Sequence, residues 1–133
     1  MRNKKTSAFR RFYDWQTKAN DDFRAMEVML KEGGLPNPIC FHAQQGAEKY
    51  LKGFLVFHFK KFSKTHSLIH LLDGCKKIDQ EFQQLEEEVL FLDTFYIETR
   101  YPGDYPSFSM KDAKEAYEAA LRVKDFVLGK IGR

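Results

Sequence analysis

The sequence predicts an all-α protein, folded as an up-and-down bundle of four long helices and one short helix. Apolar residues recur every three or four positions along most of the 133-residue chain, with little of the alternation that strands require. The 4 prolines are confined to positions 36, 38, 102 and 106, so they leave long stretches free to be helical. Charged residues make up 31% and hydrophobic residues 43%, which is ordinary for a globular protein.

The first helix is expected from about Phe9 to Lys31. One apolar stripe repeats there at helical spacing, formed by Phe12, Trp15, Ala19, Phe23, Met26 and Leu30. The GGLPNP run at 33–38 should end this helix, because glycine caps a helix and proline cannot continue it. The second helix should run from about Pro38 to Lys60, with Asn37 as its N-cap. Small residues at 43, 46 and 47 would let another helix approach it closely.

A short third helix is expected from His66 to about Lys76, capped by Thr65 or Ser63. The fourth helix should span about 79–100, with an acidic band at 86–88 that faces solvent. The last helix should begin after Ser109, because Asp112 three positions later completes an N-terminal capping pattern.

The chain is expected to form one domain, with a core from about 9 to 130 and a flexible stretch at 1–8. The net charge of +3 would suit a polyanionic partner but is too small to establish one. Cys40 and Cys75 lie in apolar segments, which indicates buried, reduced thiols in a cytosolic protein. No apolar run approaches the roughly 18 residues that a membrane span needs, and no signal-peptide core is visible. We therefore expect a cytoplasmic protein without membrane attachment.

Few catalytic or metal-binding patterns are present. The chain has neither a glycine-rich phosphate loop nor a G-x-S-x-G nucleophile turn. His66 and His70 would share a helix face, but a third zinc ligand and the glutamate of H-E-x-x-H are missing. The pattern favours a helix-starting residue and a surface residue over a metal pair. We therefore predict no metal and no cofactor.

Polar residues of the second helix form a candidate binding face. The side chains of His42, Gln45, Lys49 and Lys52 lie close to one side, shifted from the apolar stripe. Gln44 and Glu48 would form a second polar pair one turn apart. These residues fit a solvated edge, and they equally fit the lining of a groove for a phosphate or a base.

The stretch RYPGDY at 100–105 is the second candidate. Arg100 offers a planar cation that matches phosphate in a bidentate manner, and Asp104 could orient it or accept from a ribose hydroxyl. Tyr101 and Tyr105 could stack on a base. The same residues also fit a turn that ends a helix. The Pro-Gly pair favours turn geometry, and a basic residue such as Arg100 is favourable near a helix C-terminus.

Three motifs together resemble the HEPN domain family: AEKYLKG, KTHSLIHLL and RYPGDY, in that order and spacing. The likeness spans about Phe12 to Val127. It implies a bundle of four or five helices that usually forms a homodimer and associates with nucleotides or RNA. It also implies pairing with a minimal nucleotidyltransferase, commonly as a prokaryotic toxin–antitoxin system.

The family's ribonuclease branch carries an arginine followed four to six residues later by a histidine, at a metal-independent site shared by two copies. This chain keeps Arg100, but all 4 histidines precede it, and Asp104 and Tyr105 stand where the family's histidine would fall. The resemblance therefore implies nucleotide or RNA binding, in a groove between the second and fourth helices. A residual ribonuclease toxin and a purely structural partner module are the alternatives. Tyr101 or Tyr105 would be the residue controlled by adenylylation.

Overall fold

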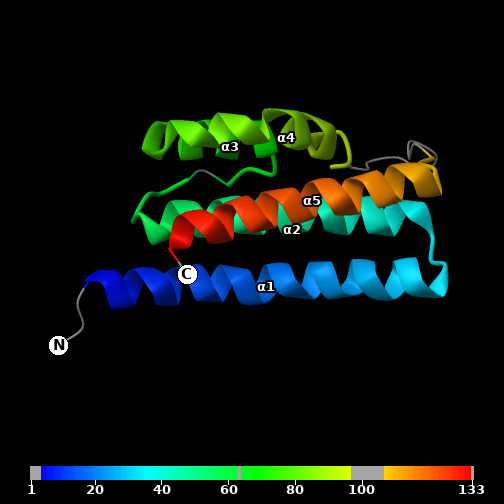
Figure 1. Ribbon diagram of the computed structural model, residues 1–133, viewed down its shortest axis with the longest axis horizontal. Helices are drawn as coiled ribbons and strands as arrows, with labels where there is room; N and C mark the ends of the chain where they lie inside the picture. Colours follow the sequence, from blue (N-terminus) through cyan, green and yellow to red (C-terminus); the bar gives the residue numbers. More distant parts are fainter. Residues whose placement is uncertain (1–3, 63, 97–106, 133) are drawn as a thin grey trace.

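The computed structural model describes residues 4–62, 64–96 and 107–132 (Figure 1). Every regular element in these ranges is helical, which confirms the predicted all-α class. The elements are α1 (Lys4–Glu32), α2 (Pro36–Phe57), α3 (Leu68–Ile78), the 3-10 helix η1 (Gln80–Leu85), α4 (Glu86–Asp93) and α5 (Met110–Ile131). None of them combines the length and apolarity needed to span a bilayer.

Helix α2 occupies the middle of the bundle. It packs against α1 on one side and against α5 and α3 on others (Figure 1). Helices α2 and α5 run in the same direction, opposite to α1, and α4 runs back along α5. Helices α1, α2, α4 and α5 therefore alternate in the up-and-down order that the sequence predicts, and α3 is the additional helix. Within the described residues α4 has 8 residues and α3 has 11.

The core is built largely from aromatic rings. Phe12, Tyr50, Phe54 and Phe82 are each at most 1% exposed. The rings of Phe54 and Phe82 have centroids 4.4 Å apart and join α2 to η1. The two cysteines are buried and free of disulfides, and burial raises the pKa of the Cys40 thiol to about 12. Both therefore behave as small core residues, as the sequence indicates.

Helices α1 and α2 approach each other closely where α2 has glycines. A Cβ atom added at Gly46 would lie 2.8 Å from the Phe23 ring, and one at Gly53 would lie 3.1 Å from Phe12. The predicted close approach at the small residues of α2 is confirmed at Gly46.

Several helix starts differ from the prediction. Helix α1 begins at Lys4 instead of Phe9. Helix α2 begins at Pro36, so the cap assignment for Asn37 is wrong; its side-chain oxygen instead accepts from the Phe108 backbone N–H at 3.0 Å. Helix α3 begins at Leu68 with Ser67 as its cap, because the Ser67 hydroxyl accepts from the first turn. Thr65 is therefore not the cap, and Ser63 lies outside the described residues.

The fourth helix is divided within its described part. Asp79 has extended backbone and caps a 3-10 helix before α4 begins at Glu86. Phe82 and Leu85 are three positions apart, a spacing that suits the three-residue turn of a 3-10 helix as well as an α-helix. Apolar periodicity alone therefore could not separate the two. By contrast, the predicted capping box of α5 is confirmed, with both Ser109–Asp112 hydrogen bonds at 3.0 Å.

Candidate functional site

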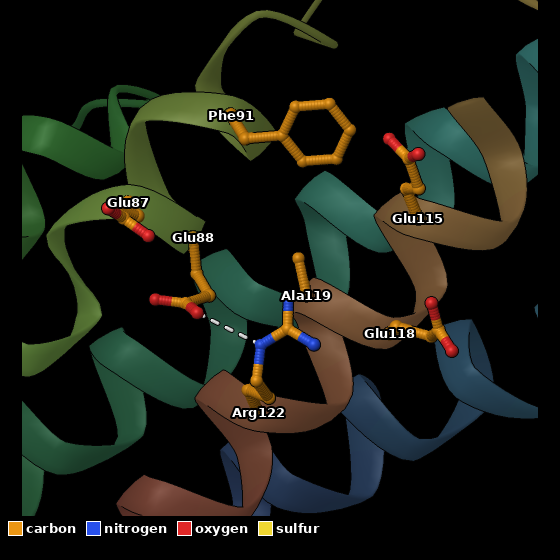
Figure 2. Close-up of a pocket in the computed structure, with 7 residues that line it drawn as sticks. All are labelled: Glu87, Glu88, Phe91, Glu115, Glu118, Ala119 and Arg122. Carbon is orange, nitrogen blue, oxygen red and sulfur yellow. Dashed lines mark hydrogen bonds and ion pairs between the residues drawn. The ribbon is translucent and has the colours of Figure 1, made fainter. Parts of the chain in front are cut away.

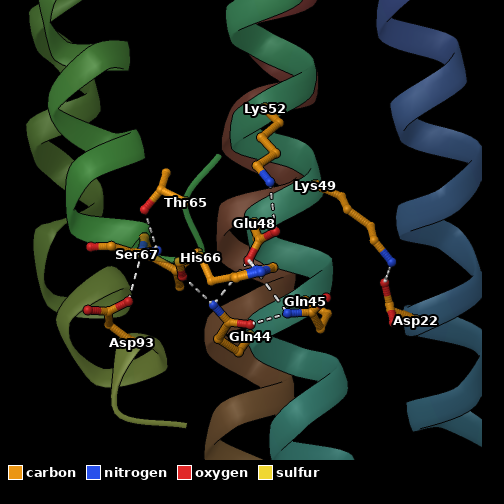
Figure 3. Close-up of polar contacts among 11 residues, drawn as sticks. Asp22, Gln44, Gln45, Glu48, Lys49, Lys52, Thr65, His66, Ser67 and Asp93 are labelled. Atoms are coloured by element: carbon orange, nitrogen blue, oxygen red, sulfur yellow. Dashed lines mark hydrogen bonds and ion pairs between the residues drawn. The ribbon is translucent and has the colours of Figure 1, made fainter. Parts of the chain in front are cut away.

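The polar face of α2 divides into two clusters. On the side of α1, His42 Nδ1 and Lys49 Nζ contact the same carboxylate, Asp22, at 2.8 and 2.6 Å. The Asp22 side chain is nearly buried and holds both groups against α1; Figure 3 shows its contact with Lys49. The positive charge of Lys49 is therefore already balanced by a neighbouring carboxylate.

The second cluster is buried between α2 and the start of α3. Gln44, Glu48 and Lys52 are 0%, 3% and 8% exposed, which is unusual for such polar residues. Lys52 Nζ donates to Glu48 Oε2 at 2.9 Å, and Gln45 Nε2 donates to Gln44 Oε1 at 2.6 Å. Gln44 in turn donates to the backbone carbonyl of His66 at 2.9 Å (Figure 3). This network satisfies the buried polar groups and fixes the segment before α3 onto α2.

His66 joins this network to the end of α4. Its Nδ1 lies 3.2 Å from Glu48 Oε1, while its ring stacks on Tyr96 with centroids 4.7 Å apart and an angle of 12°. An ionised carboxylate can only accept, so the contact favours a proton on Nδ1. The His66 side chain is 53% exposed, whereas that of Glu48 is 4% exposed. Nε2 of the neutral ring is therefore left as an acceptor beside solvent.

A depression of about 410 Å³ opens beside this stacked pair. It is lined by Lys64, Thr65, His66, Ser67, Asp93 and Tyr96. Asp93 Oδ1 accepts from the backbone N–H of Leu68 at 2.8 Å, which joins the end of α4 to the start of α3. A cation, two hydroxyls and a stacked ring pair thus meet in one concave surface, together with the Asp93 carboxylate that Leu68 engages.

The last described residue before the range 97–106 and the first one after it lie at the same end of the bundle. The rings of Phe95 and Phe108 have centroids 4.8 Å apart in an edge-to-face contact. Arg100, Tyr101, Asp104 and Tyr105 fall between these two anchors and lie outside the described residues, so their part in a site stays a prediction. The depression is lined by Tyr96, which precedes Arg100 by four positions in the sequence.

Sequence reasoning missed the roles of two residues of this surface. The pattern identifies Glu48 only as a polar partner of Gln44, and it identifies His66 as a helix-starting residue or as half of a metal pair. The structure places His66 against Glu48 instead, and the described residues contain no group of three metal-ligating side chains. The four-residue spacing of Gln44 and Glu48 beside an apolar stripe was the available signal. Contact across 18 positions between Glu48 and His66 has no local signature.

A separate depression between α4 and α5 is acidic (Figure 2). Glu87 and Glu88 face it from α4, and Glu115 and Glu118 face it from α5. Arg122 also lines it, and its Nε donates to Glu88 at 2.9 Å. This leaves three exposed carboxylates, which would repel a phosphate. The acidic depression is therefore a poor site for a nucleotide.

The HEPN domain model matches residues 12–131. Two solved structures share the fold over most of their length. ST0689, described as an archaeal HEPN homologue, is 27% identical with a TM-score of 0.71, covering 90% of this chain and 97% of that one. TT1696 from Thermus thermophilus is 30% identical with a TM-score of 0.73, covering 90% of this chain and 98% of that one. No curated protein matches.

These matches, together with the bundle and its central helix α2, define the class as a HEPN-type helical domain. The chain belongs to the HEPN family, as its three motifs predict.

Proposed function

We propose that this protein binds a nucleotide or RNA in the depression between the start of α3 and the end of α4. The observation that carries the proposal is the His66–Tyr96 stack, held against the buried Glu48. A fixed aromatic surface offers a base a stacking partner at low entropic cost, and stacking of this kind is worth about 1–3 kcal/mol per base. Lys64 and the hydroxyls of Thr65 and Ser67 line the same depression and suit phosphate or ribose oxygens.

Arg100 is proposed as the phosphate contact. Lys49 and Lys52 contribute less to a phosphate site than their charges suggest, because Asp22 and Glu48 offset them. A permanently charged guanidinium that follows Tyr96 closely in the sequence would supply the missing cation. Asp104 would orient that guanidinium or the ribose, and Tyr101 and Tyr105 would add stacking surface. Gln45 would then contribute to the α2 wall of the site, whereas His42 is held on the side of α1 by Asp22.

Family membership supports a biological setting for this binding. We propose a homodimer that works in a prokaryotic cytoplasm with a nucleotidyltransferase partner, as one component of a toxin–antitoxin pair. Tyr101 and Tyr105 are the proposed targets if that partner transfers a nucleotide to this chain.

Nucleotide binding can be measured by calorimetry with a panel of mono-, di- and triphosphates and short RNA oligonucleotides. The wild type should bind at least one of them saturably. Arg100→Ala and Tyr96→Ala should each weaken binding by about 10-fold or more, because each removes an interaction of at least about 1.4 kcal/mol. Lys114→Ala on the exposed face of α5 is the matched loss of one cation and should change little. Binding that persists unchanged in both site variants would contradict the proposal.

Ribonuclease activity is the second candidate, and the His66–Glu48 pair favours it. A histidine held by a buried carboxylate is the usual arrangement of a general acid–base, and it would replace the histidine missing after Arg100. His66 Nε2 would take the proton of a ribose 2′-OH while the 2′-oxygen attacks the phosphorus and the P–O5′ bond breaks. The imidazolium would then return the proton to O5′, leaving a 2′,3′-cyclic phosphate.

Pure protein incubated with RNA and EDTA tests this activity. A loss of cleavage in His66→Asn that clearly exceeds its loss of nucleotide binding would support it. Intact RNA after prolonged incubation would rule it out. If the protein binds no nucleotide either, yet co-purifies stoichiometrically with a neighbouring gene product, it is a structural partner module.

A further inference from the structure

A second apolar depression lies away from the proposed nucleotide site, between α3 and the end of α2. Its volume of about 810 Å³ falls in the range of ligand pockets. The floor is apolar: Leu55 and Leu71 are 3% and 1% exposed, and Ile78 and Phe62 are half-buried beside them. The Phe62 ring packs edge-to-face on Trp15 of α1, 5.9 Å away, so this wall is held by the bundle.

The rim of this groove is positively charged. Lys60, Lys61 and Lys77 are exposed there, and their side chains form neither an ion pair nor a hydrogen bond with any described residue. Some other lysines, such as Lys49 and Lys130, contact carboxylates instead. His70 adds a titratable ring, and Asp73 is the single carboxylate among the lining residues. The rim therefore carries cations without internal partners.

A strained turn positions two of these lysines. Phe59 has φ of 58°, in the left-handed region that glycine usually occupies after a helix. This conformation costs a side-chain-bearing residue about 1–2 kcal/mol. The turn is closed by a hydrogen bond from the Lys60 N–H to the Leu55 carbonyl at 2.9 Å, and the Arg11 guanidinium lies 5.2 Å from the Phe59 ring centroid. Strain held in place at the edge of a groove is an indicator of function.

A glycine lies in the helix that forms the other wall. Glycine in a helix interior is less stable than alanine by about 1 kcal/mol. A Cβ at Gly74 would lie 3.4 Å from the nearest atom, in the Leu55 side chain, which is ordinary van der Waals contact. The packing of α3 therefore tolerates a methyl group at this position. Because Gly74 has no side chain, the apolar floor of the groove stays accessible beside it.

We propose that this groove docks an acidic amphipathic segment of a partner protein. Apolar side chains of the segment would cover Leu55, Leu71 and Ile78, and its carboxylates would pair with Lys60, Lys61 and Lys77. The wall formed by His70, Gly74 and Lys77 spans about 10 Å, which matches roughly two turns of a helix. A nucleic acid would use the cations but would leave the aliphatic floor uncovered. The peptide is therefore the better match, and the site is independent of the proposed nucleotide site.

Selection from a displayed library of random peptides tests the proposal on the full chain. The wild type should enrich peptides that combine Asp or Glu with apolar residues at the helical spacing of about three or four positions. An enriched peptide, fluorescently labelled, should bind at least about 10-fold more weakly to Lys60→Glu/Lys61→Glu and to Gly74→Leu. Lys111→Glu/Lys114→Glu on α5 gives the same charge change elsewhere and should bind like wild type.

Fold integrity is checked by circular dichroism, and Gly74→Ala serves as the milder variant if Gly74→Leu does not fold. The proposal is overturned if no acidic pattern is enriched, or if the peptide binds the Lys60→Glu/Lys61→Glu variant as tightly as wild type. It is also overturned if a single-stranded RNA oligonucleotide or phosphatidylglycerol vesicles bind through Lys60 and Lys61 while the peptide does not.

Discussion

Glu48 is the residue on which the candidate site depends most. One oxygen of its carboxylate accepts from Lys52, and the other contacts His66. Both Glu48 and Lys52 are almost completely buried, so each charge relies on the other for compensation. The orientation of an exposed imidazole is therefore set by a carboxylate that solvent hardly reaches.

Removing only one member of this pair should be strongly destabilising. Glu48→Met leaves the Lys52 ammonium buried without its carboxylate, and we expect the free energy of unfolding to fall by about 3 kcal/mol. The double variant Glu48→Met/Lys52→Met removes both charges and should lose clearly less. Urea unfolding measures both. A double variant that is less stable than the single one would contradict the interpretation.

At the scale of single residues, the sequence predicts which side chains share the polar face of α2 but not their partners. Helical periodicity places His42, Gln45, Lys49 and Lys52 along one edge. It cannot reveal that Lys49 reaches Asp22, 27 positions earlier, because that contact depends on how two helices pack. From the sequence, the charges of Lys49 and Lys52 are available to a ligand. In the structure, the carboxylates of Asp22 and Glu48 already engage them.

At the scale of elements, the contact between α1 and α2 depends on glycine. The Phe23 ring lies where a side chain of residue 46 would begin. The two helices therefore meet at a distance that even a methyl group would disturb.

Gly46→Ala should reduce the free energy of unfolding by about 1–3 kcal/mol, because the added Cβ would lie 2.8 Å from the Phe23 ring. Gly129→Ala in α5 is the matched control. No atom lies within 4 Å of a Cβ at that position, so this change should instead stabilise the protein by about 0.5–1 kcal/mol. Thermal and urea unfolding compare the two. Equal effects of the two alanines would contradict the role of the close approach.

The elements were predicted best where the signal is local. The capping box at Ser109 and Asp112 fixes the start of α5 by chemistry within one turn. The division of the fourth helix was missed because Asp79 leaves helical geometry to cap Glu81, an interaction that the apolar spacing does not encode. The predicted start of α2 is wrong because the Asn37 side chain accepts from the backbone N–H of the distant Phe108 instead of capping its own helix.

At the scale of the whole molecule, the charge is divided among faces. The acidic depression between α4 and α5 and the lysine-rimmed groove between α2 and α3 occupy different parts of the described surface. The net charge of +3 averages over these opposite patches. Composition alone therefore understates how selectively this molecule can attract charged partners.

Global stability should decrease in mildly acidic solution because of His58. Partial burial lowers the pKa of this imidazole below its ordinary value of 6.5, and the nearby Lys60 acts in the same direction, while Asp79 opposes them. The unfolded chain therefore binds a proton more readily, and the free energy of unfolding should fall as the pH drops below about 6.5.

His58→Phe keeps a ring beside Phe54 and Phe57 and cannot be protonated. Urea unfolding at about pH 7 and at about pH 5.5 should show a smaller loss of stability in this variant than in wild type, since carboxylates titrate mainly at lower pH. An identical pH dependence in the two proteins would exclude His58 as the cause.

The central position of α2 also bears on how the molecule opens. Its buried residues include Gln44, Glu48 and Lys52 as well as the aromatic core. Amide hydrogens in a helix packed on several sides exchange with deuterium only when much of the fold unfolds together. Glu48, which orients His66, therefore lies in the segment where exchange should be slowest. A ligand beside His66 would contact a side of the depression that stays rigid.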